Sequence, residues 1–578
     1  MSRRGVFFLF FLIAVLGGTL LAAALMLRRP VEGAGASSVL VFDVPFDLEE
    51  AEAPAGGYSM DWLRPERPTL WSVVSALRHA AGDHHIQSLV LHVGDVDWGW
   101  AKIAEVRDAI ASFRAAGKPV YASFEGGGEK EYLLASSADL VSAPPLALLQ
   151  LDGLTASALF MRGTFDKLDI TPNFAHSGAY KSGVEGYTRG EMSPPAREAL
   201  QSLVDDLYDD LVDSLATARG MERDSVVRVL DEGPYDADAA WARGLVDTVL
   251  YEAELDSMAL DGQDGGGEPV TLTRYMDRVH NPGGHSRVAL VMASGAISEG
   301  RSRSTPGDGL ILGSETIIKA LRDARERSSV KAIVLRIDSP GGSASASDEI
   351  WHEVERCRET KPVVASMSDY AASGGYYIAV GADSIVAEPG TITGSIGVFG
   401  GKLNVLGLYR KLGLNVETVV HGEHAEMFSP FRDFTPEEAR RFQASIDGVY
   451  HTFVGRVADG RGLEADEVEQ SAQGRVWSGI AAADHALVDE LGGIPRAIEI
   501  ARAMAHIPAD EEVGVDVYPR IERTFLQRLF SGLVSSDEGD DEAAARLRLP
   551  AVVRAWLVAA HFPAGVALAL MPYDIDIR

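Results

Sequence analysis

The 578-residue chain has a single cysteine, Cys357, and far fewer basic than acidic residues. One cysteine excludes an intrachain disulfide and a cysteine-rich zinc or iron–sulfur site. Cys357 lies in a charged, helix-like stretch, so we interpret it as a structural thiol rather than a catalytic one. The 53 basic and 84 acidic residues give a net charge of −31, which would repel phosphate backbones. We therefore expect no nucleic-acid partner, and no motif of the chain indicates a metal or another cofactor.

Neither the length nor the composition fits a single small domain or a disordered chain. The protein is about four times as long as the ~150 residues usual for one domain. Its 46% hydrophobic and 24% charged residues are typical of a protein that buries enough apolar surface to offset chain entropy. Several folding units, or one duplicated unit, are expected.

One long run near the start of the chain lacks charge altogether. Residues 5–27 contain no charged side chain, and a helix of that length, at about 1.5 Å per residue, can cross a bilayer core of ~30 Å. We predict a transmembrane signal-anchor over residues 5–27, with the lipid bilayer as a partner and the bulk of the protein on the exported side. Three alanines at positions 22–24 keep a cleavable signal peptide open as the alternative.

The remainder of the chain contains one pattern twice. Residues 86–91 (IQSLVL) and 330–335 (VKAIVL) both fit fully buried parallel strands, and they lie 244 positions apart (330 − 86). Gly153 and Gly397 keep the same offset. In each copy, short apolar runs alternate with segments of helical period, which favours βαβ units around a parallel sheet. The predicted fold class is α/β, a tandem duplication of one βαβ domain preceded by the transmembrane helix.

These patterns divide the rest of the chain into four regions: a first repeat over residues 38–260, a polar and glycine-rich linker over 261–286, a second repeat over 287–507, and a C-terminal assembly or packing region over 508–578. The last region contains an apolar stretch, residues 549–571, which is interrupted by Pro550, Arg554, His561 and Pro563. We expect amphipathic packing there rather than a second membrane span.

A glycine pair follows one buried strand of the second repeat. Residues 338–342 (DSPGG) come directly after the predicted strand 331–337 and before a helix, at the carboxyl edge of the sheet where α/β proteins bind ligands. Gly341 and Gly342 can expose backbone N–H groups there, and such donors stabilise the oxyanion of a tetrahedral intermediate. The alternative is a tight strand-to-helix turn without a chemical role.

A serine occupies a similar strand-to-helix junction. Ser373 lies in residues 370–377 (YAASGGYY), after the predicted strand 363–367, where a helix N-terminus favours negative charge. Gly374 follows it and can lend its N–H to an oxyanion. The alternative role for Ser373 is a helix N-cap. The G-x-S-x-G elbow of lipases is absent because position 371 is alanine.

A serine nucleophile needs a base, and no histidine lies in a comparable loop, although His421 and His424 come nearest. A buried lysine is the other option, because desolvation disfavours the ammonium form and lowers the pKa. The first repeat supplies Lys181, in the segment SGAYKS.

The 244-residue offset divides the chemical groups between the two repeats. It places Lys181 opposite Ala425 and Ser373 opposite Glu129. The glycine pair falls opposite an aspartate and a tryptophan. The first repeat thus keeps a lysine without a serine, and the second keeps the serine without a lysine. One complete set remains, and the sequence leaves open whether its members meet within one chain, as a tandem fusion favours, or across subunits.

The motifs carry a resemblance that covers nearly the whole chain. The chain resembles the long, tandem form of the signal peptide peptidase A (protease IV) family of membrane-bound Ser–Lys peptidases, within the ClpP/crotonase-like superfamily. The resemblance rests on GAYKS around Lys181, DSPGG at 338–342, ASGGYY around Ser373 and TGSIGV at 393–398. The asparagine often found before SPGG in this family is an aspartate here.

The resemblance implies a role for each residue. Ser373 would be the nucleophile and Lys181 the general base. Gly374 with Gly341 and Gly342 would form the oxyanion hole, and Ser395 would hydrogen-bond the lysine amine. The family further implies a homotetramer in the bacterial cytoplasmic membrane, with its catalytic region on the exported side, that cleaves signal peptides after their release from precursors.

Two other function classes remain. A crotonase-like acyl-CoA enzyme would share the fold and the oxyanion hole, but it would need neither the pair of Ser373 and Lys181 nor an anchor. A catalytically inactive membrane scaffold or chaperone of the same fold would need no intact pair. The sequence does not indicate the preferred cleavage site or the natural substrates.

Overall fold

A computed structural model describes the protein over residues 38–51, 68–262, 268–277, 279, 281, 286–305, 309–508, 510–520, 565–571 and 577. The predicted transmembrane segment, residues 5–27, lies outside these residues. Among the residues described, no helix has the length and apolar character that a membrane span requires.

The first repeat is built on a six-stranded sheet in which every neighbouring pair is parallel. In spatial order its strands are β8 (Thr248–Val249), β4 (Leu140–Ala143), β3 (Val120–Phe124), β2 (Ile86–Val93), β1 (Ser38–Asp43) and β9 (Glu268–Thr271). Its apolar residues pack mainly against one layer of helices, α2 (Leu70–Gly82), α3 (Trp100–Ala115) and α4 (Glu129–Ala135). Helix α10 (Glu252–Asp261) covers the other face.

The second repeat has the same layers around an eight-stranded sheet. Its main strand order is β20 (Val476–Ser478), β18 (Ile392–Gly394), β16 (Val363–Ala372), β14 (Val330–Ser339), β10 (Arg287–Ser294) and β22 (Gly514–Tyr518), with β17 (Ser384–Ala387) and β21 (Glu490–Leu491) branching from β16. Helices α12 (Ser314–Glu326), α13 (Ala344–Arg358) and α14 (Gly374–Ala379) pack on one face. Helix α19 (Ile494–Met504) packs on the other.

Equivalent contacts in the two halves confirm the predicted duplication. The long helices α7 (Pro194–Arg219) and α16 (Pro436–Arg461) each have 26 residues, begin with proline after a capping hydroxyl and end at a left-handed glycine. Two buried tyrosines 244 positions apart, Tyr132 and Tyr376, donate their hydroxyls to the carbonyls of Leu245 and Leu487. The α/β class is likewise observed.

Part of the predicted linker, residues 261–286, forms a strand and a helix of the first repeat. Residues 268–277, which we expected to connect the repeats, form β9 and the short helix α11 (Leu272–Met276). Strand β9 pairs with β1 at the edge of the first sheet, as β22 pairs with β10 at the edge of the second. The sequence hides this strand because four residues are too few to show a period. Each repeat therefore takes its edge strand from beyond the boundary that we predicted for it.

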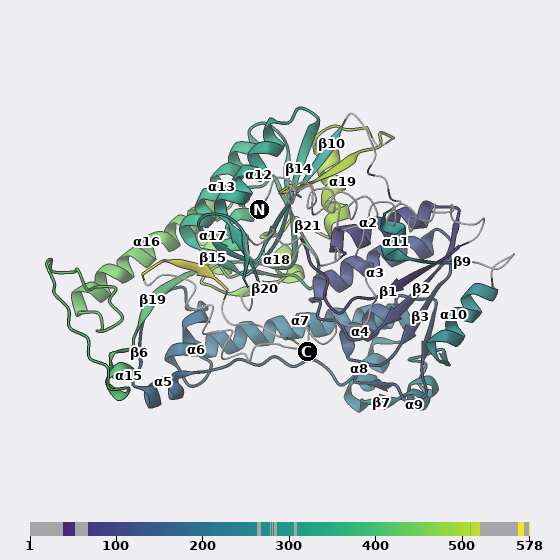
Figure 1. Cartoon of the computed structure of the whole chain (residues 1–578), viewed down its shortest axis with the longest axis horizontal. Helices are drawn as coiled ribbons and strands as arrows, with labels where there is room; N and C mark the ends of the chain where they lie inside the picture. Colours follow the sequence, from purple (N-terminus) through teal and green to yellow (C-terminus); the bar gives the residue numbers. More distant parts are fainter. Residues whose placement is uncertain are drawn as a thin grey trace, which may run out of the picture.

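A third sheet joins the two repeats and the C-terminal region. Its order is β12 (Arg303–Thr305), β13 (Gly309–Gly313), β11 (Ala296–Ser298), β15 (Gly341–Ser343), β23 (Leu568–Leu570), β19 (Val398–Asn404) and β6 (Thr171–Ser177). Strand β6 belongs to the first repeat and pairs antiparallel with β19 of the second over seven residues. Figure 1 shows β6 and β19 side by side in the arm that ends at α15 (Leu406–Lys411).

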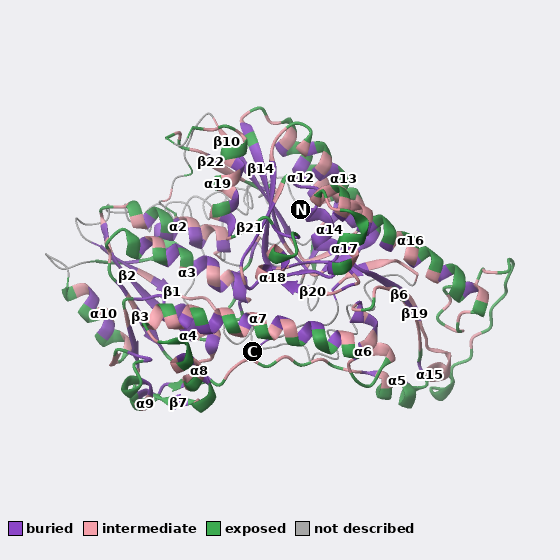
Figure 2. Cartoon of the chain, turned by 180° about the vertical axis from the view of Figure 1, so that it is seen from behind, coloured by how far each residue is buried: buried purple, intermediate pink, exposed green. Residues whose placement is uncertain are grey.

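The remaining elements are short or peripheral: β5 (Leu148–Leu149), α5 (Arg162–Leu168), the 3₁₀ turn η2 (Ser182–Val184), α6 (Glu185–Thr188), α8 (Arg223–Glu232), β7 (Tyr235–Asp236), α9 (Ala237–Ala242), α17 (Ala465–Ser471) and α18 (Gly479–Asp484). In Figure 2 the strands of the two large sheets are mostly buried, whereas the end of the arm is largely exposed.

Buried charges hold the two repeats together. Arg336 on β14 is fully buried and donates to both carboxylate oxygens of Glu50, at 2.9 and 3.0 Å, and it also contacts Glu105 on α3. Because both acids belong to the first repeat, the ion pairs cross between the repeats. Removing one member of such a buried set leaves an unpaired charge, which typically costs about 3–5 kcal/mol.

Candidate active site

Lys181 reaches the second repeat because β6 carries it there. After β6 the chain turns at Gly178, and the N–H of Tyr180 donates to the carbonyl of Gln473 at 2.7 Å. Lys181 follows with only 1% of its surface exposed. The local backbone of the first repeat is therefore fixed by residues of the second, and the lysine side chain points into the second repeat.

Ser373 lies at the end of β16, in a backbone conformation that is rare for a residue with a side chain. Its φ of 55° and ψ of −110° lie outside the favoured regions, and such a conformation costs on the order of 1–3 kcal/mol. Its N–H donates to the carbonyl of Gly394 at 2.8 Å, and its own carbonyl accepts from the N–H of Tyr377 at the start of α14. The surrounding strand and helix thus hold a strained residue, as is common at functional sites.

The structure brings Lys181, Ser373 and Ser395 together. Lys181 Nζ lies 2.8 Å from Ser373 Oγ, although 192 sequence positions separate the two residues. The same nitrogen lies 2.9 Å from both the carbonyl oxygen and the hydroxyl of Ser395. All three side chains are buried, and burial holds the pKa of Lys181 well below its ordinary value. The contact forms within one chain.

The three glycines named from the sequence lie next to this group. A Cβ on Gly374 would stand 2.6 Å from Ser347 Oγ and 3.1 Å from the Cα of Gly341, so only glycine fits there. The N–H of Gly341 donates to Ser339 Oγ at 3.1 Å, and that hydroxyl donates to the carbonyl of Gly295 at 2.7 Å. The N–H of Gly341 is therefore already engaged, which leaves the N–H groups of Gly374 and Gly342 as the candidate donors for an oxyanion.

Asp338, which replaces the asparagine of the family motif, fastens the glycine turn to the first repeat. Its Oδ1 accepts from the N–H of Tyr370 at 3.2 Å, and its Oδ2 lies 3.3 Å from Lys102 Nζ. Burial raises the pKa of Asp338 to about 6, and the ammonium of Lys102 opposes this shift. An aspartate therefore fits this turn because the first repeat supplies a cation, a contact that the sequence did not indicate.

The other pair defined by the repeat offset, Glu129 with Ala425, does not form a second site. Glu129 Oε1 accepts hydrogen bonds from the N–H groups of Asp152 and Gly153, at 2.9 and 2.8 Å. Ala425 is exposed in the loop after α15, which Figure 1 shows widely separated from α4. At the position where the second repeat has its serine, the first repeat thus has a carboxylate that binds the backbone of a neighbouring loop. The described residues contain one complete Ser–Lys set.

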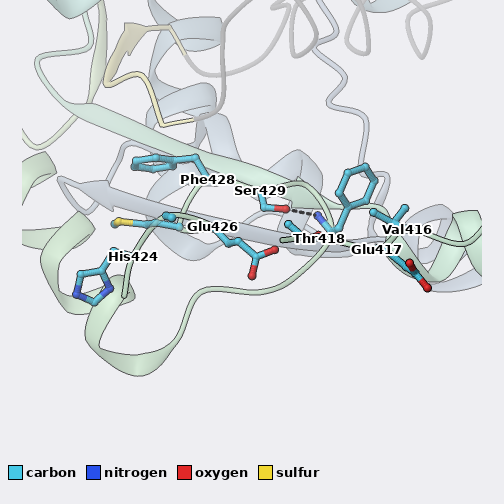
Figure 3. Close-up of a pocket in the computed structure, with 10 residues that line it drawn as sticks. Val416, Glu417, Thr418, His424, Glu426, Phe428 and Ser429 are labelled. Carbon is cyan, nitrogen blue, oxygen red and sulfur yellow. Dashed lines mark hydrogen bonds between the residues drawn. The ribbon is translucent and has the colours of Figure 1, made fainter. Parts of the chain in front are cut away.

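The other nucleophile and base considered from the sequence lie elsewhere. Burial raises the pKa of the Cys357 thiol to about 12, and its Sγ contacts the carbonyl of Leu321, as expected of a structural cysteine. His424 Nδ1 lies 3.4 Å from Glu438 Oε1. It lines a pocket of about 490 Å³ in the loop after α15, together with Glu426 and Phe428 (Figure 3). None of the predicted site residues lines that pocket.

Among the residues that the structure describes, two groups of side chains have the spacing of metal ligands, and both lie in the first repeat: residues 83–85 (Asp, His, His) and the set His92, Glu252 and Asp256. The ring nitrogens of His92 already contact Asp43 at 2.6 Å and Asp256 at 2.9 Å. Burial lowers the pKa of His92, but these two hydrogen bonds outweigh it and raise the pKa to about 9. The neighbouring carboxylates thus favour the imidazolium form of His92, which would have to lose a ring proton before it could bind a metal ion.

Comparison with known proteins matches both repeats to one family. The chain matches the family described as peptidase family S49 over residues 112–262 and again over residues 355–507. These two segments contain Lys181 and Ser373, respectively.

Several curated relatives cover most of the chain. A protein named serine protease SPPA, chloroplastic, from Arabidopsis thaliana is 37% identical over 80% of this chain and 69% of its own length. Protease 4 from Haemophilus influenzae is 32% identical over 78% of this chain and 75% of its own.

Among solved structures, a ClpP1 variant from Listeria monocytogenes matches 36% of this chain and 94% of its own, with 16% identity and a TM-score of 0.25. That similarity is too distant to decide the fold subclass, so the ClpP/crotonase-like relationship stays a prediction.

Proposed function

The chain belongs to peptidase family S49 and is a serine peptidase, and we propose that Ser373 is its nucleophile and Lys181 its general base. We further propose a membrane-anchored endopeptidase that cleaves signal peptides after their release. The observation that carries the proposal is the buried contact of 2.8 Å between Lys181 Nζ and Ser373 Oγ.

The contacts of Lys181 fit a neutral amine. A neutral lysine has two N–H donors and one lone pair. The two oxygens of Ser395 can accept the two donors, which leaves the lone pair to accept the proton of the Ser373 hydroxyl. Burial supports this protonation state because it disfavours the ammonium form. Ser395 would thus orient the amine toward the nucleophile.

This arrangement supports acyl transfer in two stages. Ser373 Oγ attacks the carbonyl carbon of the scissile peptide bond while Lys181 accepts the hydroxyl proton. The oxyanion that forms would be bound by the N–H groups of Gly374 and Gly342. Lys181 then gives its proton to the amine of the departing peptide. In the second stage, Lys181 activates a water molecule, which releases the acyl group from Ser373.

The proposed substrate and location rest on the resemblance of the motifs and on residues 5–27. An anchor at the start of the chain would hold the catalytic region at the exported surface of the bacterial cytoplasmic membrane. The apolar segment of a signal peptide would favour that bilayer, so an anchored peptidase would meet it at high local concentration. An inactive scaffold is the less favoured function because the buried Ser–Lys pair is intact.

We also propose that copies of the chain assemble by repeating a contact already present inside it. The 244-residue offset maps β19 onto residues 154–160 and β6 onto residues 415–421. Residues 415–421 lie outside any strand and are mostly exposed, and Val419 is fully exposed. In residues 154–160, only Ala156 has a β-bridge partner among the residues described, the C-terminal Ile577.

These two segments are the expected partners in neighbouring subunits. If residues 415–421 of one copy pair with 154–160 of the next in the register of β6 with β19, Ala156 lies opposite Val419. The contact is head-to-tail, so it closes into a ring when the rotation per subunit permits. A tetramer, which the resemblance implies, would be such a ring.

The catalytic proposal is tested by hydrolysis of a signal-peptide-like substrate in detergent. Ser373→Ala and Lys181→Ala should each lower turnover to less than about a tenth of the wild-type value, and the double variant should be no worse than either, because the two groups act as a unit. Ser257→Ala and Lys167→Ala, on exposed surfaces of the first repeat, are the matched controls. More than about a tenth of the activity in a folded single-site variant would overturn the assignment.

A further inference from the structure

The C-terminal strand of the protein lies between the two strands that border the candidate active site. Strand β23 pairs antiparallel with β15, which carries Gly341 and Gly342, and on its other side with β19. Figure 1 shows β23, in yellow, beside β15 and β19. An extended segment that adds a strand beside a glycine turn and a nucleophile is in the position of a bound peptide substrate.

The register of β23 places one carbonyl group at the proposed oxyanion donors. The N–H of Ala344 donates to the carbonyl of Ala567 at 3.1 Å, and the N–H of Met571 donates to the carbonyl of Pro340 at 2.7 Å. Hydrogen-bonded pairs alternate in an antiparallel ladder, so the intervening pair, Gly342 with Ala569, is also hydrogen-bonded. The carbonyl of Ala569 therefore accepts from Gly342.

The two other glycines of the site face the same carbonyl oxygen. A Cβ on Gly341 would overlap the oxygen of Ala569, and a Cβ on Gly374 would stand 3.0 Å from it. Three glycines thus make room for one carbonyl group next to Ser373. The side chain of Ala569 is fully buried, so the site accommodates a small residue at this position.

We propose that the enzyme cleaves its own chain between Ala569 and Leu570. The inference rests on the proposed function, since it uses the same Ser373 and Lys181. It adds a substrate, the C-terminal segment 565–571, and a defined bond. The nine residues 570–578 would be released, and Ala569 would become the new C-terminus.

The reaction is an ordinary peptide hydrolysis. Ser373 Oγ forms an ester with the carbonyl carbon of Ala569, the bond from that carbon to the nitrogen of Leu570 breaks, and the proton that Lys181 accepted from Ser373 passes to this nitrogen. One water molecule then hydrolyses the ester, restores the Ser373 hydroxyl and leaves a carboxylate on Ala569.

Cleavage within the same chain is expected to be efficient and independent of protein concentration. A tethered segment has an effective concentration in the millimolar range, well above that of dilute enzyme. The pairing of β23 on both sides, together with the hydrogen bond of 3.2 Å from the N–H of Gly565 to the carbonyl of Gly401, keeps the segment in place before reaction.

Intact-mass measurement of the full-length protein tests the proposal. Wild-type protein should end at Ala569, and Ser373→Ala should end at Arg578. Ala569→Asp should also keep Arg578, because an unpaired carboxylate is disfavoured at a fully buried position. Ala503→Asp, the same substitution at an exposed position of α19, should be cleaved as the wild type is. A wild-type protein that ends at Arg578, or a Ser373→Ala protein that ends at Ala569, would overturn the proposal.

Two further measurements separate the possible failures. Ser373→Ala protein mixed with wild type should keep Arg578, and its cleavage would overturn the assignment of the reaction to a single chain. Wild-type protein should hydrolyse an added signal-peptide-like substrate in the same preparation. If it does so while retaining its own Arg578, self-cleavage is wrong and the proposed function stands; if it does neither, the proposed function fails as well.

Discussion

Lys181 is the residue whose environment matters most for the chemistry. Its amine is buried beside two serines, and the pKa is lowered because the ammonium form loses its hydration without gaining a carboxylate partner at the amine. A lysine on the protein surface would be protonated at neutral pH and could not accept the proton of Ser373. Burial therefore favours the neutral amine, the form that the proposed base requires.

The first prediction is that activity rises with pH through the lowered pKa of Lys181. The protonated amine is inactive and the neutral amine is active, so the rate is low below this pKa and reaches a plateau above it. The pH profile of kcat/KM at fixed ionic strength measures it. Lys181→Arg, which stays protonated at every accessible pH, should be inactive throughout. A rising limb that persists in the residual activity of Lys181→Ala would assign the titration to another group.

The second prediction concerns Gly374. Gly374→Ala should lower kcat by ~10²-fold or more, because the added methyl group collides with Ser347 Oγ and displaces an N–H donor from the oxyanion. Gly448→Ala is the matched control: a Cβ there meets no atom within 4 Å, and alanine in a helix is favoured by roughly 0.5–1 kcal/mol over glycine. Equal activity of the two variants would exclude Gly374 from the oxyanion hole.

At the scale of elements, β6 is the strand that completes the site. It leaves the first repeat and pairs with β19 of the second, and the turn that follows it delivers Lys181. The equivalent segment of the second repeat, residues 415–421, has no such strand within this chain. This asymmetry explains why one Ser–Lys set is assembled within the chain while Glu129 and Ala425 lie far apart.

The third prediction tests the turn after β6 with two glycines that the repeat relates. Gly178 has a φ of 107° and its counterpart Gly422 has a φ of 112°, so alanine introduces similar backbone strain at both. A Cβ on Gly178 would stand 2.5 Å from the backbone of Gln473, whereas a Cβ on Gly422 would stand 3.7 Å from the Cβ of Ala425. Gly178→Ala should lose most peptidase activity and Gly422→Ala should lose little. Equal effects would mean that strain alone, rather than the position of Lys181, decides the result.

Much of this arrangement could be predicted from the sequence, because its signals are local or periodic. The repeat offset revealed the duplication, and buried strands followed by Gly341 and Ser373 indicated the edge of the sheet. The sequence could not reveal contacts made by short or distant segments. Strands β9 and β23 have only four and three residues, which is too short for a periodic pattern. The ion pair of Lys102 with Asp338 joins residues far apart in the sequence, so it is seen only in the folded structure.

At the scale of the whole molecule, two segments that the repeat offset relates to paired strands form no named strand of their own. Residues 415–421 and 154–160 are the counterparts of two strands that pair inside the chain, and both expose large apolar side chains, such as Val419 and Leu159. Exposed apolar edges of this kind favour association with another copy. The interface that we propose copies the register of the internal contact between β6 and β19.

The fourth prediction is that a charge at this edge breaks the assembly. Val419→Asp should shift the protein from an oligomer to smaller species in detergent, because a carboxylate would face Ala156 of the neighbouring copy in an apolar contact. Met258→Asp, at another exposed apolar residue, is the control. Light scattering after size-exclusion chromatography measures the mass. An unchanged oligomer for Val419→Asp would contradict this interface.

The central claim, that Ser373 is activated by the buried Lys181, is tested most directly by labelling with a serine-reactive fluorophosphonate and locating the adduct by mass spectrometry. The account predicts one adduct per chain, on Ser373, in wild-type protein. It predicts labelling reduced to the background level in folded Lys181→Ala protein, where Ser373 is present but has no base. An adduct on another serine, or undiminished labelling of Ser373 without Lys181, would contradict the claim.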